Sequence, residues 1–204
     1  TCALTILFKN GRNAFWDKKG KYFLSETALQ FIAGLLKYSA EICSVIAQWV
    51  NSYKRLVPGY EAPVYLSWAQ RNRSDLIRVP MYKPGKEDAT RVEYRAPDPA
   101  CNPYLAFSCM LRAGIRGIEE KLTPPDPVEN NIYHMTDDER KKKAIKSLPG
   151  SLIEAIQLTE KSDLVRETLG DHVFKEFIAN KKKEWDDYRQ CITDYEITHY
   201  LPVL

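Results

Sequence analysis

The apolar positions of this chain alternate in short segments of its first half and recur at helical spacing in its second half. Val64, Leu66 and Trp68 alternate with less apolar neighbours, a pattern typical of a half-buried strand. Similar short runs are bounded by Gly- and Pro-containing turns. The pattern predicts strands at 4–8, 64–68, 76–79 and 91–95.

Helical spacing begins after residues that commonly cap helices. Ser25 precedes one such segment, and a second helix is predicted at about 40–49. Asn102 is a good N-cap and Pro103 is a good first helical residue, so a third helix is expected to run to about Lys121.

The rest of the chain is predicted to be helical with short connections. Thr136 and Ser151 each begin a capping box, with a glutamate three residues later. A long amphipathic helix is expected over 173–192, with its apolar residues on one face and the lysines 181–183 on the opposite, solvated face. Strands followed by helices indicate an α+β fold with a helical C-terminal half.

Composition excludes some classes of function. The 204 residues carry 30 Lys+Arg and 27 Asp+Glu, a formal net charge of +3 that is too small and too interleaved to indicate a nucleic-acid partner. No apolar run is long enough to span a bilayer, so no membrane partner is expected. The five cysteines are odd in number and lack paired metal spacing, which favours reduced thiols in a cytoplasmic protein. The three histidines are far apart and form no metal-ligand pattern.

Charged residues alternate along the predicted strand 91–95. Arg91, Glu93 and Arg95 would share one sheet face at intervals of roughly 6.5 to 7 Å. Such a row suits an anionic, metal-bound substrate, although taken alone it is more typical of a solvated face with paired charges. Its sequence neighbours favour a site, and these are Arg55, Glu61, Arg73 and Arg78.

Three blocks in this neighbourhood resemble a known family. They are NSYKRLVPGYEAP at 51–63, RNRS at 71–74 and NPY at 102–104. Their order and spacing resemble the class I glutamine synthetases, and the resemblance covers nearly the whole chain. It implies part of that family's catalytic domain, with antiparallel strands and packed helices. Residues 1–204 would be the C-terminal portion, without the N-terminal domain and the first part of the catalytic domain.

The resemblance implies an ATP-dependent ligase that joins glutamate and ammonia through a γ-glutamyl phosphate. Phosphoryl transfer of this kind needs positioning and charge neutralisation by divalent metal, Mg²⁺ or Mn²⁺, and by arginines. By the same resemblance Glu93 is a metal ligand, and Arg95 and Arg55 contact the glutamate substrate. Arg73 and Arg78 would face ATP and the transferred phosphate. An ordinary salt bridge is the alternative for each residue taken singly.

Glu61 lies on a short loop that follows Pro58-Gly59. It matches the family's flap residue, which shields the acyl phosphate from water and assists ammonium deprotonation, so Glu61 and Arg73 are the implied catalytic residues. Arg71 and Arg91 would serve either as orienting groups or as surface charges. Tyr133 lies where one bacterial subclass is adenylylated, but the residues after it resemble the unmodified subclass, so Tyr133 is expected to remain unmodified.

Two positions depart from the family pattern. Cys2 and Leu4 align with two histidines, the first of which is a metal ligand, and the family's other metal carboxylates precede Thr1. The isolated chain is therefore expected to be inactive. Two alternatives stay open: a catalytically inactive glutamine-synthetase-like structural protein, and a ligase that joins glutamate to another amine.

The chain ends in an apolar tail, YLPVL at 200–204. The resemblance implies a double hexameric ring whose C-terminal segments reach from one ring into the other. The tail would then be a contact between rings, and the alternative is that it folds back onto its own subunit.

Overall fold

The computed structural model describes residues 2–60 and 62–203. Its main sheet has the order β1-β6-β5-β4, and a separate hairpin pairs β2 with β3. The strands are β1 (Ala3–Thr5), β2 (Phe8–Lys9), β3 (Arg12–Asn13), β4 (Tyr65–Ala69), β5 (Asp75–Arg78) and β6 (Val92–Tyr94).

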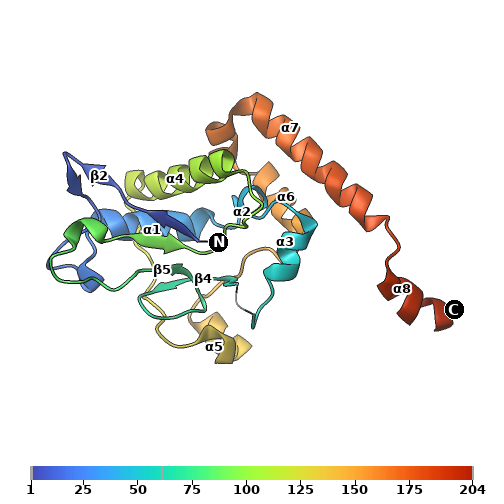
Figure 1. The fold of residues 1–204 in the computed structure, drawn as a ribbon, viewed down its shortest axis with the longest axis horizontal. Helices are drawn as coiled ribbons and strands as arrows, with labels where there is room; N and C mark the ends of the chain where they lie inside the picture. The colour runs from blue at the N-terminus through green and yellow to red at the C-terminus, as the bar shows by residue number, and fades with distance from the viewer. Residues whose placement is uncertain (1, 61, 204) are drawn as a thin grey trace.

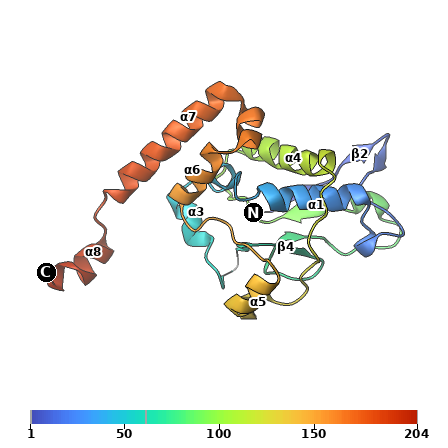
Figure 2. The ribbon, with the colours of Figure 1, turned by 180° about the vertical axis from the view of Figure 1, so that it is seen from behind.

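Helices make up the remaining regular structure. The α-helices are α1 (Glu26–Tyr38), α2 (Cys43–Ile46), α3 (Val50–Arg55), α4 (Pro103–Glu119), α5 (Asp137–Lys142), α6 (Leu152–Glu160), α7 (Asp163–Arg189) and α8 (Asp194–His199). The short 3-10 helices are η1 (Lys21–Phe23), η2 (Glu87–Ala89), η3 (Ile132–His134) and η4 (Leu201–Val203). Helices α1 and α4 lie side by side over the sheet, whereas α7 leaves the body and carries α8 away from it (Figures 1 and 2). Among the described residues, no helix combines the length and the apolar composition that a bilayer crossing requires.

The α+β fold predicted from the sequence is confirmed, including the helical C-terminal half after Pro103. The expectation of antiparallel strands is wrong for one pair. β1–β6 and β5–β6 are antiparallel, but β4 and β5 run parallel, with Tyr65 beside Asp75 and Ala69 beside Arg78. Apolar alternation assigns faces to a strand but does not fix the direction of its neighbour. The predicted strand 4–8 is also divided, because β1 ends at Thr5 and β2 begins at Phe8.

Most predicted helix starts are confirmed by side-chain caps. The Ser25 hydroxyl accepts from Ala28 N at 3.1 Å, the Asn102 carbonyl accepts from Tyr104 N at 3.0 Å, and Thr136 forms a reciprocal capping box. The box predicted at Ser151 is only half formed, because Glu154 Oε2 accepts from Gly150 N at 2.8 Å rather than from Ser151.

Two helix predictions need correction. The segment 40–49 forms only the single turn α2, and α3 begins at Val50. The lysine run on α7 is not wholly solvated, because Lys181 is buried. Its ammonium donates to Gln48 O at 3.1 Å and pairs with Glu184 at 2.6 Å. A buried lysine needs such partners, and periodicity alone does not reveal them.

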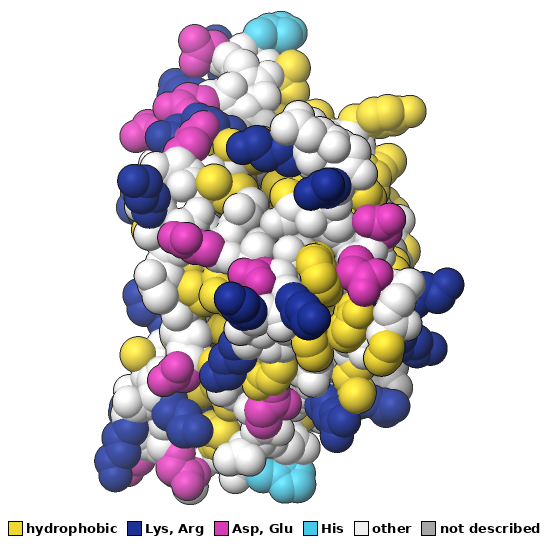
Figure 3. Space-filling model, turned by 90° about the vertical axis from the view of Figure 1, so that its left-hand side faces the viewer, with side chains coloured by type: hydrophobic (Ala, Val, Ile, Leu, Met, Phe, Trp, Pro, Cys, Tyr) yellow, Lys and Arg dark blue, Asp and Glu magenta, His cyan; other side chains and the backbone are white. Residues whose placement is uncertain are grey.

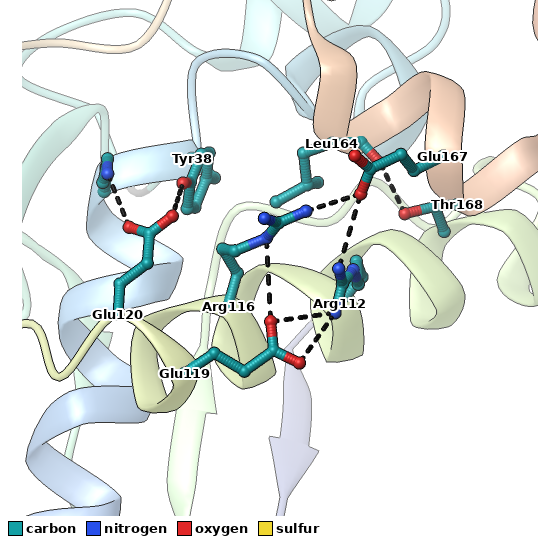
Figure 4. A network of polar contacts seen from close by, with 9 residues as sticks. Tyr38, Arg112, Arg116, Glu119, Glu120, Leu164, Glu167 and Thr168 are labelled. Atoms are coloured by element: carbon teal, nitrogen blue, oxygen red, sulfur yellow. Dashed lines mark hydrogen bonds and ion pairs between the residues drawn. The ribbon is translucent and has the colours of Figure 1, made fainter.

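Ion pairs between charged side chains attach α7 to α4. Arg112 and Arg116 on α4 both donate to Glu167 on α7, at 3.4 and 2.5 Å (Figure 4). Arg112 also pairs with Glu119 at 3.1 Å. On the face shown in Figure 3, basic and acidic side chains are interspersed rather than gathered by sign.

The α1–α4 contact depends on glycine. A methyl group on Gly117 would lie 2.2 Å from the carbonyl oxygen of Gln30 and 2.6 Å from the Cα atom of Gly34. Both are backbone atoms, so neither can rotate away. The two helix backbones therefore touch directly, and this close approach fixes the layer that covers the sheet.

We expect Gly117→Ala to lower the free energy of unfolding by about 2–3 kcal/mol because the added methyl group forces the two backbones apart. Helix propensity acts in the opposite direction, by about 1 kcal/mol, so it cannot explain a loss. Urea unfolding monitored by circular dichroism measures the change. Gly150→Ala is the control, because its methyl group would meet only the side chain of Glu154, at an ordinary contact distance of 3.6 Å. Equal stability of the two variants would contradict the backbone contact.

Candidate functional site

A cleft of about 700 Å³ opens beside β5 and β6. It is lined by Cys2, Gly59, Tyr60, Arg73, Arg78, Glu93, Arg95 and Tyr133. Four of the residues predicted from the sequence are thus brought together, although they come from three separate segments of the chain. Because three of the four are arginines, the cleft is suited to an anion.

A carboxylate–guanidinium pair lines the cleft. Antiparallel pairing places Arg78 on β5 opposite Glu93 on β6, and Arg78 Nε donates to Glu93 Oε2 at 2.5 Å. The Glu93 side chain is only 8% exposed, whereas that of Arg78 is 41% exposed. The pair compensates the buried carboxylate while leaving the guanidinium open to the cleft.

Arg95 follows β6 and lies over the turn that leads into β5. Its Nη1 atom donates to the carbonyl oxygens of Arg73 and of Asp75, the latter at 3.2 Å. Backbone carbonyls therefore hold this guanidinium without neutralising its charge. Arg73 itself is exposed at the edge of the cleft.

The other predicted arginines lie elsewhere. Arg55, at the end of α3, donates to Ala96 O at 2.6 Å and pairs with Asp98 at 3.7 Å, so it braces the segment after β6. Arg91 lines a separate cavity of about 450 Å³ next to Tyr82. Neither Arg55 nor Arg91 is among the residues that line the cleft beside β5 and β6.

The predicted flap residue, Glu61, lies outside the described residues. Its neighbours Gly59 and Tyr60 line the cleft, and Tyr60 is 71% exposed. The role assigned to Glu61 therefore stays a prediction from the sequence.

The residues near Glu93 do not complete a divalent-metal site. Cys2 lies in the cleft, and Leu4 on β1 is directly opposite Glu93 in the strand register. A thiol and an aliphatic side chain are poor partners for Mg²⁺, which prefers oxygen ligands. In the part of the chain that the structure describes, no group of three or more His, Cys, Asp or Glu side chains could hold a metal ion. Glu93 is the one carboxylate among the described residues that line the cleft.

Tyr133 closes one wall of the cleft. Its hydroxyl donates to Ala62 O at 3.4 Å, and its ring lies 5.9 Å from that of Tyr65. Burial raises the pKa of the Tyr133 phenol. The expectation that Tyr133 is unmodified stays a prediction.

Sequence reasoning missed Asp75, the residue directly after the RNRS block. The residue is fully buried at the start of β5, and the Ser67 hydroxyl donates to its Oδ1 atom. Its Oδ2 atom has no hydrogen-bond partner among the described residues. Burial raises the pKa of Asp75 to about 7. A single aspartate that begins the apolar run Leu76-Ile77 is the signal that could have identified it.

The raised pKa of Asp75 has a consequence for stability. Below about pH 4 the carboxyl is protonated in both the folded and the unfolded chain, so it contributes no pH dependence. Between about pH 4 and 7 the unfolded chain loses the proton first, so stability falls as pH rises, by on the order of 4 kcal/mol at most. Above about pH 7 the carboxyl is ionised in both the folded and the unfolded chain, so this group no longer changes the stability as pH rises.

Asp75→Asn removes this titration. We expect the stability of the variant relative to the parent chain to rise by about 2–3 kcal/mol between pH 5 and pH 8. Chemical denaturation at both pH values measures the difference. Asp126→Asn, at an exposed position, should show no such change. A pH-independent difference for Asp75→Asn would contradict the raised pKa.

The comparisons with known proteins agree with one another. The profile of the family "Glutamine synthetase, catalytic domain" matches residues 2–200. The glutamine synthetase of Methanosarcina mazei is 50% identical over 198 residues, which cover 97% of this chain and 44% of that protein. The glutamine synthetase of Thermus thermophilus is 51% identical over 195 residues, which cover 96% and 43%.

Solved structures show the same relationship. The complex of GmaS with ADP has a TM-score of 0.86 and 29% identity, covering 98% of this chain and 45% of that chain. Apo GmaS has a TM-score of 0.79 and 31% identity, covering 94% and 42%. The chain spans less than half the length of these relatives. The similarity in sequence and fold nevertheless extends over almost the whole chain, and the chain therefore belongs to the glutamine synthetase family.

Proposed function

We propose that a protein containing this chain uses ATP to join glutamate and ammonia through a γ-glutamyl phosphate. The observation that carries the proposal is the single cleft in which Arg73, Arg78 and Arg95 surround the buried carboxylate of Glu93. Phosphoryl transfer moves negative charge between oxygens, and fixed guanidinium groups stabilise that charge. The ADP in the GmaS complex supports a nucleotide as one ligand of this fold.

Each arginine contributes differently. Arg95 is held by backbone carbonyls and keeps its full charge, so it suits a carboxylate of glutamate. Arg73 is exposed at the cleft edge and suits the transferred phosphate, whereas Arg78 suits ATP. Arg55 braces Ala96 and Asp98, so its contribution to glutamate binding is to position the segment that carries Arg95.

The metal is proposed to be Mg²⁺ or Mn²⁺, to which this chain contributes Glu93. The described residues contain no group of three or more His, Cys, Asp or Glu side chains that could hold a metal ion, so the remaining ligands are proposed to come from outside them. Glu61 is proposed as the flap residue on the sequence match alone.

The chain spans about 44% of the M. mazei relative, so we propose that it is part of a longer protein. Its placement in the C-terminal portion of the catalytic domain rests on the sequence blocks alone. By itself the 204-residue chain is expected to be inactive, since Glu93 lacks metal partners among the described residues. The cytoplasm is the proposed compartment, on the cysteine composition of the sequence.

A second candidate is a glutamine-synthetase-like protein without catalysis, and Cys2 and Leu4 beside Glu93 favour it. Glutamate-dependent phosphate release by the longer protein would exclude this candidate. A third, ligation of glutamate to another amine, is distinguished by replacing ammonium with a panel of alkylamines. A preference for an alkylamine would contradict ammonia as the acceptor.

We expect Arg95→Ala in the longer protein to lower kcat/KM for glutamate by about 100-fold or more, because a fixed charge in the cleft is lost. Phosphate release with glutamate, ATP, Mg²⁺ and ammonium measures the effect. The matched control is Arg166→Ala, on the surface of α7 and paired with Asp171 at 3.8 Å, which should leave the rate within about twofold. An unchanged kcat/KM for glutamate in Arg95→Ala would contradict the assignment of Arg95 to glutamate binding.

We also propose that α8 and η4 form contacts between subunits in a double hexameric ring. Tyr195 stacks on His199 with ring centroids 4.3 Å apart, but the apolar side chains at the end of the chain stay exposed, 63% for Leu201 and 80% for Val203. The tail therefore does not fold back onto the body in this structure, and α7 projects it outward (Figure 1). Burial of three such side chains contributes roughly 1.5–3 kcal/mol each before ordering costs.

Truncating the longer protein after Asp194 removes nearly all of α8 and η4. We expect the assembly to dissociate into single rings or smaller species because the exposed apolar segment is lost. Light scattering coupled to size exclusion measures the mass. An unchanged double ring would show that the tail does not carry this contact.

A further inference from the structure

Asp75 is an acidic group that the proposed reaction does not use. It lies at the start of β5, beside Tyr65 of β4, and is fully buried. The Ser67 hydroxyl donates to Oδ1, while Oδ2 has no partner among the described residues. A buried carboxyl with one unpaired oxygen is held more easily as the neutral acid than as the anion.

The same residue supports the cleft through its backbone. The Asp75 carbonyl oxygen accepts from Arg95 Nη1 at 3.2 Å, and the Arg73 carbonyl accepts from the same atom. The Arg95 guanidinium is therefore hydrogen-bonded to the backbone of residues 73–75, the segment that carries the Asp75 carboxyl. The charge of this guanidinium acts to lower the pKa of that carboxyl.

The other groups that face Asp75 come from several elements. They are Glu129 in the segment after α4, Asn72 in the β4–β5 turn, Ser67 on β4, Tyr133 in η3 and Tyr22 in η1. Glu129 opposes ionisation of Asp75, whereas Arg95 and the hydrogen bond from Ser67 favour it. Burial outweighs these and raises the pKa to about 7. The phenols of Tyr22 and Tyr133 have raised pKa values because both are desolvated, so they stay neutral through this range.

We propose that Asp75 is a positioning residue whose gain or loss of a proton sets how Arg95 is held over the Arg73–Asp75 turn. When the carboxyl is protonated, Arg95 keeps its charge directed to the cleft. When it ionises, its free oxygen attracts the guanidinium inward and offsets its charge. Anion binding in the cleft should then weaken as pH rises through neutrality. This last consequence rests on the proposed function, because it takes the cleft as an anion site.

The direct test is the Nε–Hε resonance of Arg95 in the 204-residue chain, followed by NMR from pH 5.5 to 8.5. We expect the chemical shift of this resonance to change with a midpoint near pH 7. The change should disappear in Asp75→Asn and remain in the control Asp126→Asn, whose substituted residue is exposed. Ser67→Ala removes a hydrogen bond that favours the ionised form, so it should move the midpoint to higher pH and provides a second variant with Asp75 intact. A structural role alone would not move this midpoint. An Arg95 resonance that does not titrate, or that titrates equally in Asp75→Asn, would overturn the inference.

Sulfate tests the consequence, because its charge is constant over this pH range. At fixed ionic strength, its dissociation constant in the parent chain should rise by about three- to tenfold from pH 6 to 8.5 and stay flat in Asp75→Asn. The same pH dependence in both proteins would contradict the role of Asp75 in anion binding. Absence of sulfate binding in both proteins at every pH would contradict the anion site, and so the proposed function, while the Arg95 titration still decides the role of Asp75.

Discussion

The antiparallel register between β5 and β6 places Arg78 opposite Glu93, and the other groups of the cleft are located relative to that pair. Arg95 follows β6 directly and reaches back over the turn before β5. Arg73 lies in that turn. A shift of one residue in the register would turn Glu93 toward the core, where Val92 and Tyr94 are fully buried, and would disperse the arginines.

Three like charges can share this cleft because each is held differently. Arg78 is paired with a carboxylate, Arg95 is held by carbonyl oxygens, and Arg73 is exposed to water. Among the described residues that line the cleft, only Arg78 has an acidic partner, so these residues leave a net positive charge. Asp75 lies beneath this arrangement as a weak acid, which makes the field responsive to pH near neutrality.

The support for the sheet is a helix layer whose spacing is set by backbone contact. Gly34 and Gly117 allow α1 and α4 to approach until their backbones touch, and ion pairs from Arg112 and Arg116 attach α7 to α4. From there α7 extends away from the body and exposes α8 (Figure 2). The sheet and the helix layer thus hold the cleft, whereas α8 and η4 present exposed apolar side chains.

Local sequence patterns determined most of the strand positions and helix starts of this protein. Apolar alternation identified β4, β5 and β6 within one or two residues, and Ser25, Asn102 and Thr136 capped the helices that they were expected to cap. These features depend on neighbours within a few residues, so the sequence contains them directly. The thirteen-residue block at 51–63 likewise identified the family, which the comparisons confirmed.

Tertiary structure alone decided the rest. The parallel pairing of β4 with β5, the burial of Lys181 against Gln48 and the burial of Asp75 against Ser67 all depend on segments that meet only in the folded chain. The tertiary structure also places Arg55 and Arg91 outside the cleft, although both lie close to Arg73 and Arg95 in the sequence. Side-chain period gives the face on which a residue lies, whereas desolvation and charge depend on what is packed against that face, and no local pattern encodes that.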